Sequence, residues 1–464
     1  MTTRTKRIII IIALAQILLA LGVFALPKVV QALPGRYLVR LQNHPLTSGI
    51  VERISTPFPS ALPVADGSAT RASVALDELP EIPGLPENQQ LASTTPTAQP
   101  SPTETPQVAT TPTQEVTAPP PTETPTATPS PTPTPLPERV LLDDLITVVQ
   151  GFNNCGPANL TIALNYFGDD TTQEVAAAYL KPNEEDRNVS PWQIDEYVNQ
   201  FTALRSTVHS GGDLEMLKQL IAAGFPVVIE KGYEPSNGTG WYGHYLTVYG
   251  YDETAEEFYS RDTNLGPFDG SPRVDSYDEF NHWWQQFNYT FYVVFPESDV
   301  TTVMDIIPDV LEEEASMWQY TAELAREEIR QDPENVFTYF NLGVSLTRLG
   351  ELSGDPSYYN EAVQAFDQAR EISLPPRTLF YEHRPLMAYW KAGRLDDVME
   401  LTDAVLAVSG GRWVEEIFWY RGHALASQGD LLAAHDAYST ALEVNSNFYP
   451  AQQSLDWVDS LISG

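Results

Sequence analysis

A segment rich in proline and threonine divides this chain and limits where it can fold. Residues 93–137 contain 14 prolines and 15 threonines, only three charged residues and no aromatic residue. Such a composition cannot bury enough apolar surface to offset the entropy of ordering the backbone, and its prolines favour an extended polyproline conformation. The segment is therefore predicted to be a disordered stalk, and folded domains are expected only outside it.

An uncharged, strongly apolar run lies near the N-terminus, at residues 8–26. In a helix with a rise of 1.5 Å per residue, this run covers most of a hydrocarbon layer of about 30 Å. The basic tail at residues 1–7 places the N-terminus in the cytoplasm and the rest of the chain outside. We expect a retained transmembrane signal anchor. The alternative is a cleaved signal peptide with a small-residue cleavage site at residues 30–32, which would make the protein secreted.

The net charge of -36 is unevenly distributed along the chain. Residues 1–51 hold six basic residues and no acidic one, and the remaining 20 basic and all 62 acidic residues follow. An acidic body of this kind repels phosphate backbones, so nucleic acid is excluded as an expected partner. Residues 27–92, between the anchor and the stalk, receive no functional assignment.

The only cysteine, Cys155, follows the stalk, so no intrachain disulfide can form. Residues 145–149 read as a short strand, and the apolar spacing after Cys155 predicts a helix that ends at Gly168. Cys155 would then lie in the first helical turn, where the dipole and the unsatisfied N–H groups favour the thiolate. Gln150, five residues earlier, could direct its amide to an oxyanion beside the Cys155 N–H. A thiol that packs as a small hydrophobe is the competing interpretation.

A general base for this thiol is expected at His244. This residue opens an alternating run, residues 243–251, that is typical of a strand. A second strand-like stretch ends at Asp262 after a polar turn. In a hairpin of that register Asp262 could approach His244 and orient its imidazole.

These motifs together resemble the C39-like family of papain-fold cysteine peptidases, over about residues 140–297. The resemblance rests on Gln-x4-Cys-Gly-Pro-Ala, on Gly-His-Tyr-x-x-Val-Tyr-Gly-Tyr-Asp, and on an acid after the next strand. It implies an α+β papain-like domain at residues 138–298. It also implies four roles. Cys155 would be the nucleophile and His244 the base, while Asp262 would orient the histidine and Gln150 would donate to the oxyanion.

The match departs from the family pattern after the acid, where Thr263 occupies a position that is often proline. This departure leaves Asn264 as an alternative orienting residue. Family members in transporters cut leader peptides, but no phosphate-binding Gly-x4-Gly-Lys-Ser/Thr loop occurs here, so leader-peptide processing is not inferred. No His, Cys, Asp or Glu cluster has metal-ligand spacing, and we expect neither a metal nor a cofactor.

Helical periodicity replaces strand alternation from residue 308 to the C-terminus at residue 464. Gly350, Gly393 and Gly429 follow Gly343, Leu386 and Gly422 by seven residues each, which indicates an internal repeat. The region resembles tetratricopeptide repeats, with three helix pairs over about residues 335–447. The resemblance implies an all-α array whose concave surface binds a peptide or protein partner.

The sequence thus predicts a membrane-anchored, extracytoplasmic cysteine peptidase that cuts a peptide or protein through an acyl-enzyme. Two other classes remain open at this point. One is a catalytically silent peptidase-like scaffold whose helical repeats bind a partner. The other is a different acyl-transfer enzyme on the same fold, such as an amidase or a transglutaminase-like protein, because the chain order Cys, His, Asp is shared by these families.

Overall fold

The computed structural model describes residues 61–65, 135–235, 240–408 and 410–463. The predicted signal anchor at residues 8–26 and all but the last three residues of the stalk lie outside these residues. Among the helices that the structure does describe, none is long and apolar enough to cross a bilayer.

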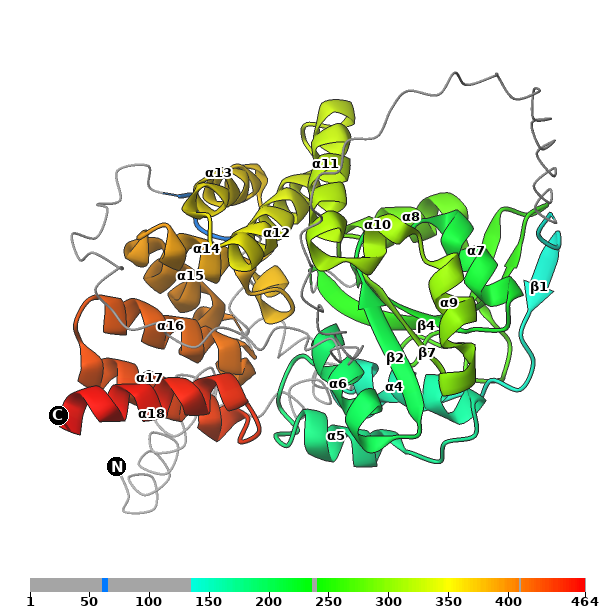
Figure 1. Ribbon diagram of the computed structural model, residues 1–464, viewed down its shortest axis with the longest axis horizontal. Helices are drawn as coiled ribbons and strands as arrows, with labels where there is room; N and C mark the ends of the chain where they lie inside the picture. The colour runs from blue at the N-terminus through cyan, green and yellow to red at the C-terminus, as the bar shows by residue number, and fades with distance from the viewer. Residues whose placement is uncertain (1–60, 66–134, 236–239, 409, 464) are drawn as a thin grey trace, which may run out of the picture. The chain divides into compact units, whose positions relative to one another are not determined.

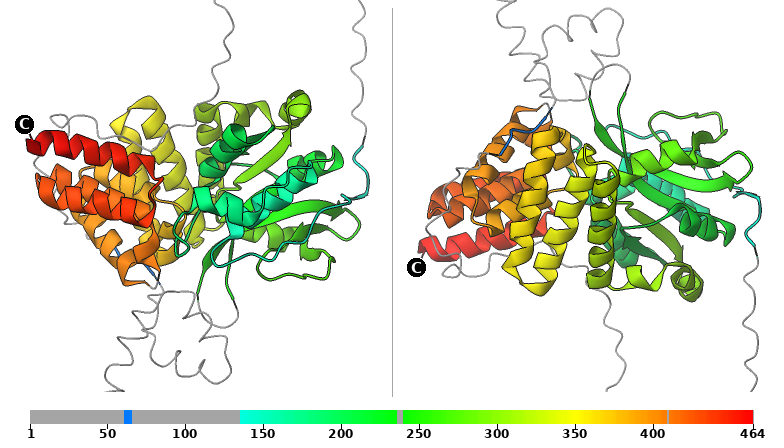
Figure 2. Two further views of the ribbon diagram at one scale, coloured as in Figure 1. Left: turned by 90° about the horizontal axis from the view of Figure 1, so that it is seen from below. Right: turned by 90° about the horizontal axis from the view of Figure 1, so that it is seen from above.

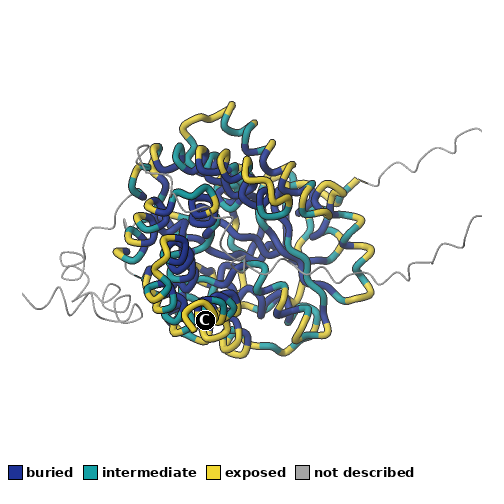
Figure 3. Tube along the Cα trace, turned by 60° about the vertical axis from the view of Figure 1, so that its left-hand side comes forward, coloured by how far each residue is buried: buried dark blue, intermediate teal, exposed yellow. Residues whose placement is uncertain are grey.

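An antiparallel sheet forms the centre of the domain that follows the stalk (Figure 1). Its strands are β1 (Arg139–Leu141), β2 (Leu204–His209), β3 (Val227–Tyr233), β4 (Tyr242–Asp252), β5 (Glu257–Arg261), β6 (Arg273–Ser276) and β7 (Phe291–Pro296). Their order is β2-β7-β3-β4-β5-β6, and β1 pairs with the last residues of β4, beyond the residues that pair with β3. The central strands are buried along their length, as the dark tube in Figure 3 shows.

Helices cover both faces of this sheet. One face packs against α4 (Cys155–Tyr166), α5 (Gln173–Leu180) and α6 (Pro191–Phe201). The other packs against α7 (Leu214–Ala222) and α8 (Tyr277–Gln285). Alternate β4 residues therefore enter different cores: Tyr245 faces the α4 side and Leu246 the α7 side. The α+β architecture expected for this domain is confirmed.

The strand expected at residues 145–149 does not form. Both edges of β4 are already paired, with β3 and β1 on one side and β5 on the other. The segment instead crosses α4 as irregular chain, and Leu145 packs against Ile162 and Tyr249 in a small apolar cluster. Its apolar residues are thus buried by packing on a helix, and that burial accounts for the strand-like composition.

The C-terminal region is helical, as expected. It begins with η2 (Glu297–Asp299), α9 (Val300–Ile306), α10 (Asp309–Glu312) and α11 (Glu314–Gln331). Three consecutive pairs follow: α12 (Val336–Ser353) with α13 (Pro356–Ile372), α14 (Arg384–Lys391) with α15 (Leu395–Ala407), and α16 (Glu415–Ser427) with α17 (Leu431–Val444). Short 3-10 turns η3 (Pro376–Phe380) and η4 (Gly411–Trp413) separate the pairs, and α18 (Tyr449–Ser463) ends the described chain.

In the first and the third pair, a glycine of the first helix packs against an aromatic ring of the second helix. A Cβ on Gly343 would lie 2.5 Å from the ring of Phe366, and one on Gly422 would lie 2.4 Å from Tyr438. Each glycine therefore lets an aromatic ring of the next helix approach its backbone. The turn of the first pair lies at Gly354, with φ +69°, whereas Gly350, one of the glycines of the repeat, is still helical inside α12.

The helical region and the α+β domain share a continuous apolar core that includes Trp284 of α8 and Trp318 of α11. Polar bonds accompany it: Asn341 Nδ2 donates to the Gln285 carbonyl at 2.7 Å, and Tyr289 donates to Glu328 Oε1 at 2.6 Å. In the right-hand view of Figure 2, α11 runs beside α12, on the side of α12 that faces the α+β domain.

Candidate active site

Cys155 is the first residue of α4, directly after the irregular segment that follows β1. Its side chain is partly exposed, whereas the next nine residues of the helix are all buried. The side chain of His244 and the backbone of Tyr245 lie close enough to the thiol to lower its pKa. The structure therefore brings β4 against the N-terminal end of α4, with the thiol between them.

His244 and Asp262 are joined by a hydrogen bond of 3.0 Å between Nε2 and Oδ1. Both side chains are almost completely buried. Because Nε2 donates to the carboxylate, Nδ1 is the ring nitrogen left for the thiol. The histidine thus links Cys155 and Asp262, in the chain Cys, His, Asp that the sequence indicated.

Asp262 is fixed by three further groups. Its Oδ1 accepts the backbone N–H groups of Asn264 at 2.9 Å and Leu265 at 2.8 Å, and its Oδ2 accepts Arg273 Nη1 at 3.2 Å. Burial opposes ionisation, but the charge of His244 and these hydrogen bonds hold the pKa of Asp262 well below its usual range. The alternative residue, Asn264, directs its side chain to the Tyr233 hydroxyl at 3.4 Å and not to His244.

The thiol and the imidazole shift each other's titration. Burial raises the pKa of Cys155, but the hydrogen bond and charge of His244, and then the charge of Lys181, lower it more. Burial likewise lowers the pKa of His244, and the charge and hydrogen bond of Asp262 outweigh it, raising the pKa to about 9. Both shifts favour a thiolate beside an imidazolium, the reactive form of a cysteine nucleophile.

Gln150 is oriented by Thr263, the residue at which the sequence departs from the family pattern. The Gln150 N–H donates to the Thr263 carbonyl at 2.8 Å, and the Thr263 hydroxyl donates to Gln150 Oε1 at 2.8 Å. Because Oε1 accepts this bond, the Nε2 end of the amide is the end available to donate to a ligand. A hydroxyl at position 263 therefore fixes which way the amide of Gln150 faces.

Asn159, one turn after Cys155 on α4, ties the helix to the strand of the histidine. Its Nδ2 donates to the carbonyls of Cys155 at 2.9 Å and Tyr245 at 3.0 Å, while its Oδ1 accepts the Thr247 hydroxyl at 2.8 Å. It is 0% exposed, which leaves no room for a glycan at its sequon. Nothing in the sequence pairs Asn159 with Thr247, 88 positions later.

Lys181 is a second group that sequence reasoning missed. It is 3% exposed, and its Nζ donates to the carbonyls of Asn153 at 3.2 Å, Phe152 at 3.5 Å and Asp186 at 3.0 Å. The ammonium therefore holds the loop that carries Cys155. Lys181 follows α5 in an ordinary polar stretch, so no local signal marks it.

The helical region reaches this site through the residues at η3. A Cβ on Gly243 would lie 3.0 Å from the ring of Tyr381, and the Arg377 guanidinium lies 3.9 Å from the centre of the Tyr242 ring. The Tyr381 carbonyl also accepts Asn188 Nδ2 at 3.5 Å. Residues of the helical region thus pack against the part of β4 that directly precedes His244.

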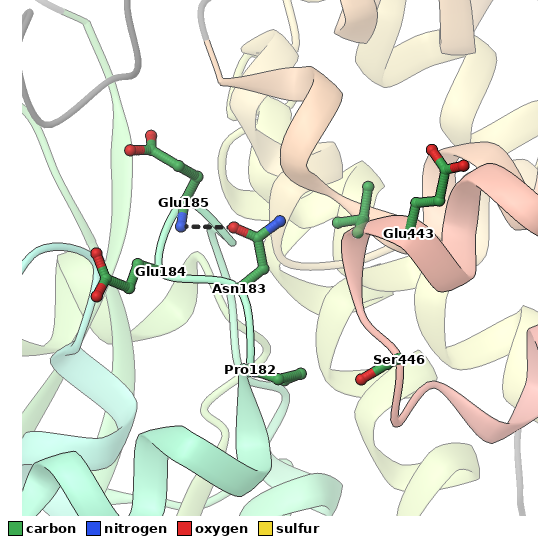
Figure 4. A pocket seen from close by; sticks show the side chains of 7 residues that line it. Pro182, Asn183, Glu184, Glu185, Glu443 and Ser446 are labelled. Atoms are coloured by element: carbon green, nitrogen blue, oxygen red, sulfur yellow. Dashed lines mark hydrogen bonds between the residues drawn. The ribbon is translucent and has the colours of Figure 1, made fainter.

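A hollow of about 470 Å³ lies elsewhere, between the loop after α5 and the end of α17 (Figure 4). It is lined by Pro182, Asn183, Glu184, Glu185, Glu443, Val444 and Ser446. In Figure 4 the Asn183 side chain accepts the Glu185 N–H at 3.0 Å. None of the four expected site residues lines it. Within the described parts of the chain, no group of three His, Cys, Asp or Glu side chains is placed to hold a metal ion.

The α+β domain is similar in sequence to a known family. Residues 142–292 match the Peptidase_C39 like family, so this part of the chain is a C39-like peptidase domain. A solved structure described as a putative C39-like peptidase from Bacillus anthracis is similar at 18% identity, with a TM-score of 0.29. That match covers 35% of this chain and 99% of the other. No curated protein matches the chain.

Proposed function

We propose that this protein is a cysteine peptidase that hydrolyses a peptide bond through an acyl-enzyme on Cys155. The observation that carries the proposal is the position of His244, which lies beside the Cys155 thiol and is hydrogen-bonded to the Asp262 carboxylate. The match of residues 142–292 to the Peptidase_C39 like family supports the same reaction class.

In the first half of the reaction the Cys155 thiolate attacks the carbonyl carbon of the substrate peptide bond. The oxygen that becomes negative accepts hydrogen bonds from the Cys155 N–H and from Gln150 Nε2. The His244 imidazolium gives its proton to the leaving nitrogen, the C–N bond breaks, and the amine departs. The acyl group remains on sulfur as a thioester.

In the second half, water attacks the thioester carbonyl. Neutral His244 takes a proton from the water, the C–S bond breaks, and the acid product leaves. The thiolate and imidazolium are regenerated, so the cycle consumes one water and no cofactor. Throughout, Asp262 keeps the imidazole in the orientation in which Nδ1 faces sulfur.

The remaining parts of the proposal concern where the enzyme acts and what it binds. The apolar run at residues 8–26 would anchor it in a membrane, with the peptidase domain outside the cell. The helical region, interpreted as tetratricopeptide-like repeats, would bind a protein or peptide partner. The support for its part in substrate binding is the contact of Tyr381 and Arg377 with the strand that carries His244.

A peptide library tests the proposal. The full chain should cut a subset of peptides, giving new termini by mass spectrometry, and the Cys155→Ala variant should cut none. Absence of cleavage by the full chain would favour a silent scaffold. Release of ammonia from glutamine side chains, or their coupling to added amines, would instead favour an amidase or transglutaminase-like reaction.

A further inference from the structure

Residues 61–65, which precede the stalk in the sequence, form a short irregular segment. Figure 1 draws it in blue beside α13 and α14. Leu62 is 3% exposed and belongs to the apolar core of the helical region, whereas Val64, two residues later, is 61% exposed. One side chain of the segment is therefore inserted and the next points to solvent.

The backbone of this segment is bonded on both sides of the Leu62–Pro63 peptide bond. The Leu62 N–H donates to the Leu374 carbonyl at 2.8 Å, and the Pro63 carbonyl accepts Arg370 Nε at 2.6 Å. Proline suits position 63, since no N–H is used there, whereas position 62 requires an N–H. The contacts thus fit a leucine followed by a proline in extended chain.

Contacts with the surrounding helices position the Arg370 side chain to donate to this carbonyl. It is 1% exposed, its two terminal nitrogens donate to Asp397 at 2.7 Å and Glu400 at 2.9 Å, and it lies over the Tyr389 ring. Only Nε points to the segment. Without the segment, a buried Nε–H would lose its acceptor, which is costly for a charged group.

We propose that Arg370 and Leu374 form a peptide-binding site for a Leu-Pro segment, and that the chain's own residues 61–65 occupy it as an intramolecular clasp. The occupant is identified by its place in the structure, by the buried leucine and by two backbone bonds. Because the segment is tethered to the site that it occupies, a foreign peptide displaces it only at a concentration above the effective concentration set by the tether.

In a chain anchored at residues 8–26, the clasp decides whether the stalk contributes to the distance between the anchor and the folded domains. The chain is held at Leu62, before the stalk, and again at Pro137, the last residue of the stalk, where the Tyr251 hydroxyl donates to the Pro137 carbonyl at 2.9 Å. While the clasp is closed, the stalk lies between two points of one folded unit and does not set the distance to the anchor. That distance is then set by the residues between the anchor and Leu62, and opening the clasp adds the stalk to it.

Thiol protection tests the clasp independently of peptidase activity. In the full chain carrying Cys155→Ala, Leu62→Cys and Val64→Cys each introduce the only thiol. Iodoacetamide should modify the Leu62→Cys chain at least about tenfold more slowly than the Val64→Cys chain, because that thiol reacts only when the clasp opens. In urea the two rates should become equal. Equal rates in the native chain would overturn the proposal.

A second pair of variants separates recognition by Arg370 from general loosening. Arg370→Met removes the donor to Pro63 and should speed modification of the Leu62→Cys thiol about fivefold or more. Arg394→Met is the matched control, since Arg394 bonds Asp397 and Asp367 in the same network without touching the segment. Circular dichroism checks that both variants are folded. No change with Arg370→Met, or an equal change with Arg394→Met, would contradict the assignment.

Discussion

His244 lies on β4 and Asp262 directly follows β5, the next strand of the hairpin, and a bond of 3.0 Å joins the histidine Nε2 to the aspartate Oδ1 inside the protein. This bond decides which nitrogen faces Cys155. Burial alone would lower the pKa of His244, but the charge of Asp262, this bond and the neighbouring Cys155 together raise it to about 9. The reactivity of the thiol should therefore depend on a carboxylate that does not touch it.

Removal of that carboxylate charge is the first test. Asp262→Asn should lower kcat by about 10²–10⁴-fold, because the imidazole loses both its orientation and the charge that keeps it protonated. The measurement is kcat on a peptide found by library profiling. Asn264→Ala should change kcat little, since the Asn264 side chain bonds Tyr233. A larger loss in Asn264→Ala would make Asn264 the orienting residue.

If Gln150 donates to the oxyanion, its removal should lower kcat without changing the rate at which Cys155 is alkylated. Gln150→Ala should reduce kcat by about 10²–10³-fold, because one donor to the developing oxyanion is lost. Alkylation of Cys155 forms no oxyanion and should proceed at the wild-type rate. Thr263→Val, which releases the Gln150 amide, should reduce kcat in the same direction by less. An unchanged kcat in Gln150→Ala would remove Gln150 from the mechanism.

Lys181 should influence both the position and the charge of the nucleophile. Lys181→Met keeps the length of the side chain but removes its charge and its bonds to the Phe152 and Asn153 carbonyls. The pKa of the Cys155 thiol should rise, moving the acid limb of the alkylation profile to higher pH. The exposed Lys391 provides a matched control, as Lys391→Met should leave the profile unchanged. A profile unmoved by Lys181→Met would limit Lys181 to a structural role.

Buried carboxyl groups between the α5–α6 loop and α16 predict an unusual dependence of stability on pH. Burial, and then the charge of Asp186, raise the pKa of Glu416 to about 8, and burial raises that of Asp186 to about 7. Because these folded-state values exceed the ordinary carboxyl range, these two groups hold more protons in the folded chain than in the unfolded chain at intermediate pH. Its stability should fall as the pH rises from about 5 to about 8.

Thermal unfolding measures this effect. The melting temperature should be higher at pH 6 than at pH 8.5, by about 2–4 °C. Glu416→Gln should raise the melting temperature at pH 8.5 and flatten the profile. Glu443→Gln makes the same change of charge at an exposed position and should do neither. Equal effects of the two substitutions would attribute the trend to the net charge of the chain.

Much of the fold and of the site geometry was predictable because it is encoded locally. The helix at Cys155 is marked by its apolar spacing and by Gly168, whose φ of +84° ends it. The strand at His244 is marked by alternation, and Asp262 by its distance from the hairpin turn. Each of these predictions needed only short-range pattern.

The parts that sequence reasoning missed depend on contacts distant in the chain. Residues 145–149 have the composition of a strand, but β4 had no free edge for them. Lys181 and Tyr381 reach the site from a loop and from the helical region, and no local pattern reports either contact. Leu62 lies more than 300 positions before its partner Leu374, in a stretch that carries no periodicity.

The central claim is that Cys155 is a thiolate at neutral pH because His244, held by Asp262, lies beside it. The rate of Cys155 alkylation by iodoacetamide at pH 6, in the full chain and in His244→Ala, tests it most directly. We predict rapid alkylation of the wild-type thiol at pH 6 and a large decrease in His244→Ala. A thiol that reacts only near pH 8–9, with the same rate in both proteins, would contradict the account.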